Sequence, residues 1–151
     1  MLSLLFESSF YSFAFYVAIN ALIMLVLGIL VTRARMNTQT PIGDGGGRPD
    51  MAGPLRAHGN NTEYVPMALL LMWVLCLPAI GGSIWLIHGV GAPLTIGRIL
   101  HAIGLSRSIG PTPLRLIGMV LTWIAYIVGI VGVLYLVFSG ISATFAAAAA
   151  S

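Results

Sequence analysis

Four polar and charged residues open an otherwise apolar segment near the middle of the chain. They follow one another at spacings of 0, +4, +7 and +8: Arg56, Asn60, Glu63 and Tyr64. At about 3.6 residues per turn, these positions fall on one side of a helix. Charged residues at a membrane boundary are costly unless they are paired or hydrated, so they often mark functional sites. Two interpretations remain open: the residues bind a polar ligand, or an Arg56–Glu63 pair only anchors the helix end.

A second polar set follows at Arg98 and His101, which are three residues apart and therefore share a helix face. Arg98 lies about two turns inside the predicted helix, roughly 10 Å deep. The side chain can snorkel to the surface, or it can take a partner. Glu63 is the only acidic residue inside a predicted helix core, so we expect Glu63 and Arg98 to lie close together.

Arg115 opens the last predicted helix, where a cation opposes the helix dipole. This position suggests that Arg115 serves an anion rather than the helix. Arginine forks suit carboxylates, and Glu63 suits an ammonium group. A small zwitterion with several carboxylates fits this combination, and glutathione is one such compound.

The run from Arg56 to Pro66 resembles the signature of the MAPEG family, the membrane-associated proteins in eicosanoid and glutathione metabolism. The pattern is an arginine followed four, seven and ten residues later by asparagine, glutamate and proline. The run Gly97–Leu105 resembles the third-helix motif of the family, and Pro113–Arg115 resembles the start of its fourth helix. The similarity covers about Phe10–Phe138, nearly the whole chain.

The resemblance implies an all-α bundle of four transmembrane helices with up-down topology, assembled as a homotrimer. It further implies that glutathione lies between subunits as a co-substrate and that Arg115 stabilises its thiolate. His101 would line the site, and Arg33 or Arg35 would come from the first helix of the adjacent subunit. One departure is Leu105, where relatives with a second tyrosine place a hydroxyl. The positions that match glutathione-holding residues are Arg56, Asn60, Glu63 and Tyr64. Arg98, in the third-helix motif, is also expected to bind the substrate.

The composition supports a membrane protein: 58% of the 151 residues are hydrophobic and only 7% are charged, against about 25% charged in soluble domains. A membrane helix needs about 20 apolar residues, and Gly and Pro clusters divide the apolar stretches. The chain is predicted to form one domain over residues 1–151. Its helices are expected at about 10–32, 55–79, 83–105 and 114–138, with a flexible loop at 37–54 and a disordered tail at about 143–151.

The seven basic residues are all arginines, and all fall at one end of the predicted bundle. The positive-inside rule assigns that end to the cytoplasm and both termini to the outside. The short hairpin and long glycine-rich loop resemble the bacterial branch of the family, so we expect the bacterial inner membrane. There is no dense basic patch, so nucleic-acid binding is not expected.

The function favoured by these observations is a glutathione-dependent transferase or peroxidase acting on small hydrophobic electrophiles. The alternative is a non-catalytic structural or accessory subunit with the same fold. Expected partners are other copies of the chain, membrane lipid, a hydrophobic small molecule and, in the second case, a larger membrane complex. Neither metal nor haem is expected, because His88 and His101 lie thirteen residues apart on one helix and cannot face one haem iron.

Overall fold

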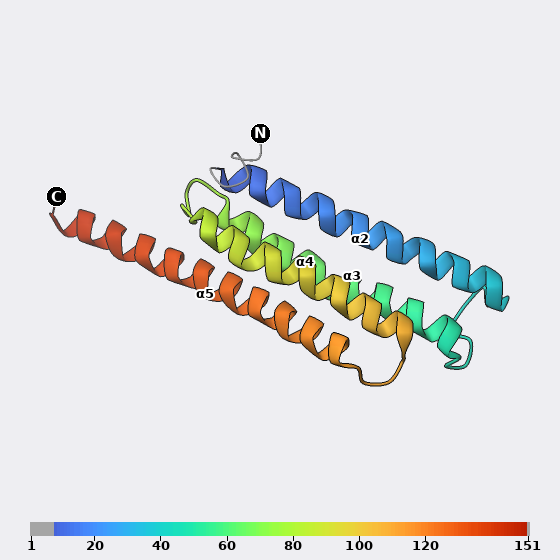
Figure 1. Cartoon of the computed structure of the whole chain (residues 1–151). Coiled ribbons are helices and arrows are strands. Elements are labelled where there is room, and N and C mark those ends of the chain that lie inside the picture. Colours follow the sequence, from blue (N-terminus) through green and yellow to red (C-terminus); the bar gives the residue numbers. More distant parts are fainter. Residues whose placement is uncertain (1–7, 151) are drawn as a thin grey trace.

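The computed structural model describes residues 8–150, which form four helices in up-down order (Figure 1). Helices α3 and α4 contact each other and both outer helices, while α2 and α5 lie on opposite sides of them. Both ends of the described chain lie at the same end of the bundle as the α3–α4 connection. The helices are α2 (Ser9–Thr38), α3 (Pro49–Leu75), α4 (Ile84–Arg107) and α5 (Pro113–Ala150).

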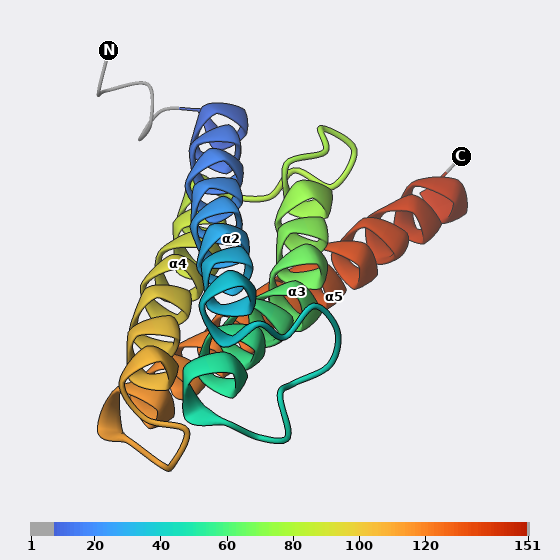
Figure 2. The same cartoon turned by 90° about the vertical axis from the view of Figure 1, so that its right-hand side faces the viewer.

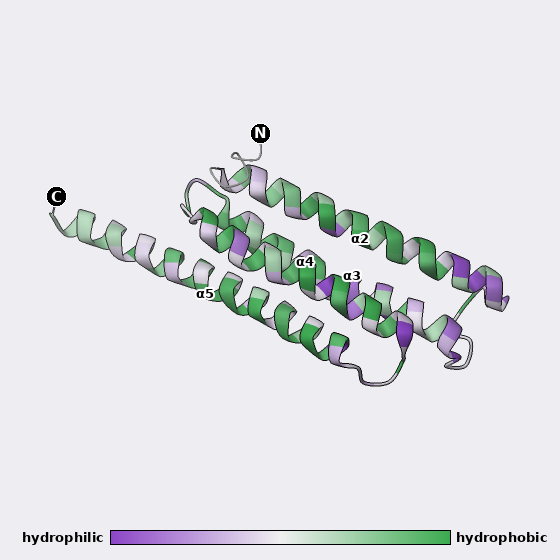
Figure 3. Ribbon diagram, in the orientation of Figure 1, coloured by the Kyte–Doolittle hydropathy of each residue, from purple (hydrophilic) through white to green (hydrophobic). Residues whose placement is uncertain are grey.

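Three helices, α2, α4 and α5, are long and apolar enough to cross a membrane. Helix α3 falls outside this group because its first half carries the polar cluster that begins at Arg56. Green apolar residues cover most of the bundle, and purple hydrophilic residues gather near the α2–α3 and α4–α5 connections (Figure 3). The four-helix membrane bundle predicted from the sequence is therefore confirmed.

Helix α3 begins six residues before the predicted start at 55, and the connection from α2 is correspondingly shorter than predicted. Pro49 occupies the first helical turn, where its missing N–H costs nothing and its fixed φ suits a helix. The Arg48 guanidinium forms an ion pair of 2.8 Å with the Asp50 carboxylate, and this hydrogen bond holds the pKa of Asp50 below its usual value. An anionic residue in the first turn also favours the helix start.

Helix α5 also differs from the prediction, because it continues to Ala150 instead of ending near 138. The tail from about 143, expected to be disordered, is part of this helix as far as Ala150; Ser151 lies outside the described residues. Alanine has the highest intrinsic helix propensity, and no proline interrupts the segment after Pro113. The 38-residue helix is roughly 57 Å long, and its last turns project beyond the other helices (Figure 2).

The connection at residues 39–48 is held in place at its start by Arg35. The guanidinium Nη1 of Arg35 donates to the carbonyl oxygens of Thr40, Pro41 and Gly43 at 3.1, 3.2 and 3.3 Å. Left-handed backbone at Gly43 (φ 78°) and at residues 45–47 lets the chain turn back toward α3. The connection thus brings Asp44 over the polar half of α3.

Helices α4 and α5 approach closely through a pair of glycines. A Cβ built on Gly118 would lie 2.6 Å from the carbonyl oxygen of Gly97, and one on Gly97 would lie 2.8 Å from that of Gly118. Small residues of this kind allow membrane helices to pack backbone against backbone. This contact lies one turn from His101, so it sets the distance between the site residues of α4 and α5.

Candidate functional site

The polar half of α3 borders a cavity of about 380 Å³, which we call the polar cavity. Its walls come from α3, α4, the first turn of α5 and the 39–48 connection, and its volume is within the range of ligand pockets. The spacing on α3 explains why three of its polar residues reach the same space. The lining residues are Asp44, Leu55, Arg56, Gly59, Asn60, Glu63, His101, Leu105 and Arg115.

The charges of the polar cavity are balanced. Arg56 and Arg115 supply two guanidinium groups, while Asp44 and Glu63 supply two carboxylates. A second cavity of about 360 Å³ continues from the first and shares Asp44, Arg56 and Arg115. A ligand that carries both carboxylate and ammonium groups complements such a lining.

Arg98 does not line the polar cavity but is buried between α3, α4 and α5, with 2% of its surface exposed. Its Nη1 donates to the side-chain Oδ1 of Asn60 at 2.7 Å, and its Nη2 donates to Thr122 Oγ1 at 2.8 Å. The expected pairing of Arg98 with Glu63 is wrong, because Arg48–Asp50 is the one ion pair within residues 8–150. Dipoles of an amide and a hydroxyl compensate the buried charge instead of a carboxylate.

The contact with Arg98 also determines what Asn60 can offer a ligand. Because the side-chain oxygen of Asn60 accepts from Arg98, its remaining side-chain group is the NH₂ donor. Asn60 lines the polar cavity, so it is suited to donate to a carbonyl or carboxylate there. Arg98 is therefore a positioning residue for the site.

Tyr64 packs on the buried side of the same network. The Cζ of Arg98 lies 5.3 Å from the centroid of the Tyr64 ring, a distance typical of a cation–π contact. The Tyr126 hydroxyl donates to the Tyr64 carbonyl at 2.8 Å, and the two rings meet edge to face. Tyr64 does not line the polar cavity in the single chain.

Arg115 lies in the first turn of α5 and already holds the α4–α5 connection. Its Nη1 donates to the carbonyl oxygens of Ile109, at 2.8 Å, and Gly110. Its Nε and Nη2 take no partner within the described part of the chain. Arg115 can therefore be fixed by the connection and still direct N–H groups at an anion in the polar cavity.

A third space, the α4–α5 cleft, adjoins the polar cavity and has a volume of about 490 Å³. It is bordered mainly by apolar residues, and two of them, Leu116 and Trp123, are 65% and 52% exposed on the apolar outer face. His101 and Arg115 line both the cleft and the polar cavity. A polar and an apolar compartment thus meet at these two side chains.

Arg33 lies away from the polar cavity of its own chain, whereas Leu105 lies in the cavity wall. Arg33 is exposed on α2, and no residue of α2 lines the polar cavity, so one chain alone does not bring Arg33 to it. Leu105 lines the cavity and is 4% exposed, packed with Leu27 and Ala57. The Leu105 side chain therefore makes this part of the cavity wall apolar.

Sequence reasoning missed Asp44, Thr122 and Tyr126. Thr122 is a hydroxyl-bearing residue in a long apolar stretch without charged residues. A polar residue in such a stretch indicates a buried hydrogen bond and could have been found from the sequence. Asp44 carries no such signal, because its place depends on the turns of the connection. Within residues 8–150, no group of three or more His, Cys, Asp or Glu residues could hold a metal ion.

Comparisons with known proteins identify relatives of the chain. The sequence profile described as the MAPEG family matches residues 13–135. Two curated relatives from different strains of Escherichia coli are each named inner membrane protein YecN. Each is 34% identical over 112 residues, which cover 74% of this chain and 82% of the relative. No solved structure matches the chain.

Proposed function

The chain belongs to the MAPEG family of membrane proteins, and from this premise we propose that it binds glutathione in the polar cavity and activates its thiol. The activated thiol attacks a small hydrophobic electrophile, which makes the protein a membrane transferase or peroxidase. The residue chemistry of the cavity supports this assignment. Arg56 suits a glutathione carboxylate, Glu63 suits the ammonium group, and the Asn60 amide suits a peptide carbonyl.

The role of Arg115 is to stabilise the thiolate. A guanidinium beside sulfur favours the thiolate over the thiol, and the thiolate is the nucleophile. In the transferase reaction, sulfur forms a bond to the electrophilic carbon, and the displaced group leaves with the bonding electrons. In the peroxidase reaction, two glutathione thiols are oxidised to one disulfide while a hydroperoxide is reduced to an alcohol and water.

The observation that carries this proposal is that His101 and Arg115 line both the polar cavity and the α4–α5 cleft. A polar thiol and an apolar electrophile need separate compartments that meet where sulfur reacts. Proximity of two bound reactants removes much of the entropic barrier to a bimolecular step. The cleft opens among exposed apolar side chains, from which a membrane-dissolved electrophile can enter.

The site is completed by a second copy of the chain in a homotrimer, as the family resemblance implies. Arg33 then reaches the polar cavity of a neighbouring subunit, because Arg35 is engaged with its own connection. By its similarity to inner membrane protein YecN, the protein resides in the bacterial inner membrane. The arginine-bearing end faces the cytoplasm, and both termini face outward.

Thermal stability of the detergent-solubilised protein against a panel of thiols tests the proposal. A specific ligand raises the apparent stability by mass action. We expect glutathione to stabilise the protein, and S-methylglutathione, which keeps the tripeptide charges, to do so as well. Stabilisation by none of the thiols, together with no conjugation of hydrophobic electrophiles, would favour the accessory-subunit function instead. The apolar Leu105 in the cavity wall is the observation that supports this second function.

A further inference from the structure

An apolar groove lies between α2 and α4, on a different edge of the bundle from the polar cavity. Its volume is about 390 Å³, and we call it the α2–α4 groove. None of its lining residues belongs to α3, α5 or the 39–48 connection. The groove is lined by Leu22, Ile23, Val26, Leu27, Leu30, Ile99, Ala102, Ile103, Ser106 and Arg107.

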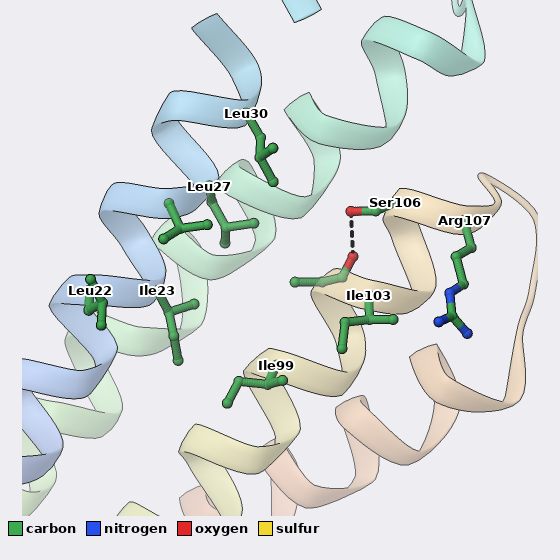
Figure 4. A pocket seen from close by; sticks show the side chains of 10 residues that line it. Leu22, Ile23, Leu27, Leu30, Ile99, Ile103, Ser106 and Arg107 are labelled. Atoms are coloured by element: carbon green, nitrogen blue, oxygen red, sulfur yellow. Dashed lines mark hydrogen bonds between the residues drawn. The ribbon is translucent and has the colours of Figure 1, made fainter. Parts of the chain in front are cut away.

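The sequence spacing explains the shape of the groove. On α4, Ile99, Ile103 and Arg107 recur every four residues, so they form one stripe. On α2, Leu22, Val26 and Leu30 do the same. Figure 4 shows the labelled α2 side chains across the gap from Ile99 and Ile103. Eight residues of helix span roughly 12 Å, which is less than one leaflet of a hydrocarbon core about 30 Å thick.

Polarity changes sharply along this groove. Its deeper part is bordered by leucine, isoleucine and valine side chains, while Ser106 and Arg107 lie at the arginine-bearing end. The Ser106 hydroxyl already donates to the Ala102 carbonyl at 2.9 Å (Figure 4). Arg107 is exposed and makes no hydrogen bond or ion pair within residues 8–150. The end of the groove thus presents an unused guanidinium at the membrane surface.

Arg33 adds to the positive charge at this end. It follows Leu30 by three residues, which places it on the same stripe of α2 as Leu22, Val26 and Leu30. An apolar channel that fits within one leaflet and ends at cationic groups complements a lipid with an acyl chain and an anionic headgroup. Basic pockets between transmembrane helices bind such headgroups, and arginine forks bind phosphate oxygens in pairs.

We propose that the α2–α4 groove is a binding site for an anionic phospholipid, with an acyl chain between α2 and α4 and the phosphate at Arg107. The groove shares no lining residue with the polar cavity, so the proposal holds whether or not the protein is a transferase. A second copy of the chain is a less suitable occupant, because none of the three apolar membrane-length helices α2, α4 and α5 carries an acidic residue that could meet Arg107.

Native mass spectrometry of the full-length protein, released from bilayer discs of equal phosphatidylglycerol and phosphatidylcholine with identical acyl chains, tests the site. We expect about a fivefold excess of retained phosphatidylglycerol, the factor that corresponds to ~1 kcal/mol for one arginine near the surface. Arg107→Gln should reduce this excess to about one. Equal retention of the two lipids by the unaltered protein would overturn the proposal.

Two tryptophan substitutions on α2 provide a matched pair. Val26 lines the groove and is 47% exposed, whereas its neighbour Leu25 is 60% exposed and does not line it. Val26→Trp should fill the groove and abolish retention of phosphatidylglycerol, while Leu25→Trp should not. If Val26→Trp instead changes the number of subunits and leaves the lipid bound, the groove is an interface between copies and the proposal is wrong. Arg107→Gln, at an exposed position, remains informative if a tryptophan variant does not fold.

Discussion

Arg98 donates to the side-chain oxygen of Asn60 over 2.7 Å, although Arg98 itself does not line the polar cavity. The same guanidinium donates to Thr122 on α5 and lies over the ring of Tyr64. One buried cation therefore links the three helices that surround the site. The orientation of the Asn60 amide, and with it the hydrogen bonding offered to a ligand, depends on this contact.

Replacing the buried guanidinium should cost both stability and ligand affinity. Arg98→Leu leaves Asn60 Oδ1 without its donor, at a cost of ~1–3 kcal/mol, whereas the Thr122 hydroxyl keeps its hydrogen bond to the Gly118 carbonyl. It also frees the Asn60 amide to rotate, which should weaken ligand binding about tenfold, or ~1.4 kcal/mol. Thermal unfolding in detergent and ligand titration measure the two effects.

The control for this substitution is Arg48→Gln, which removes an exposed arginine from an ion pair. It should change stability by less than ~1 kcal/mol. Equal stability and affinity of Arg98→Leu and the unaltered protein would contradict the positioning role.

The close approach of α4 and α5 predicts that alanine substitutions at two glycines of α5 change stability differently. Gly118→Ala places a methyl group 2.6 Å from the Gly97 carbonyl oxygen, so the helices must separate, at a cost of ~1–3 kcal/mol. Gly140→Ala, on the same helix, meets nothing within 4 Å and should be neutral or stabilising by up to ~1 kcal/mol. Thermal unfolding of both variants should give opposite or clearly different shifts, and equal shifts would argue against this packing.

Leu105 offers a test of whether the apolar cavity wall weakens glutathione binding. Leu105→Tyr adds a phenol at a position that lines the polar cavity, where its hydroxyl can hydrogen-bond to a bound ligand. We expect a lower glutathione dissociation constant, measured by calorimetric titration. Leu105→Phe adds the ring without the hydroxyl and should not improve binding. If the two variants bind equally, the ligand does not reach this wall.

The orientation in the membrane is predicted by the arginine distribution. In a Cys76→Ala background, single cysteines at the exposed residues Ile42 and Ser108 should react with an impermeant reagent only from the cytoplasm. Those at Ala79 and Ser142 should react only from outside. Gly82 is unsuitable for this purpose, because a Cβ there would collide with the Leu75 carbonyl oxygen. Labelling of Ile42 and Ala79 from one side would be incompatible with the up-down bundle.

The sequence was sufficient to predict the four membrane helices, because charge-free stretches and Gly–Pro breaks mark them directly. It also predicted the shared side of α3, since helical periodicity alone places Arg56, Asn60 and Glu63 together. The end of α5 was not predicted, because an alanine run is compatible with both a frayed tail and a continued helix. There the high helix propensity of alanine decides the outcome.

The partner of Arg98 was predicted incorrectly for a different reason. Pairing by elimination considered only formal charges, whereas the Asn60 amide and the Thr122 hydroxyl accept hydrogen bonds from the two terminal nitrogens of the guanidinium. Asp44 was missed because its position results from several contacts of the connection, including the Arg35 hydrogen bonds to Thr40 and Gly43. Such contacts depend on tertiary structure and leave no periodic pattern in the sequence.

The most direct test of the proposed function is the ultraviolet absorbance of the glutathione thiolate, followed while glutathione is titrated into the purified protein at neutral pH. The account predicts a saturable thiolate signal in the unaltered protein. Arg115→Ala should lose the signal while still binding glutathione, whereas Arg56→Ala should need more glutathione to reach it. Glutathione binding without any thiolate signal in the unaltered protein, or an undiminished signal in Arg115→Ala, would contradict the account.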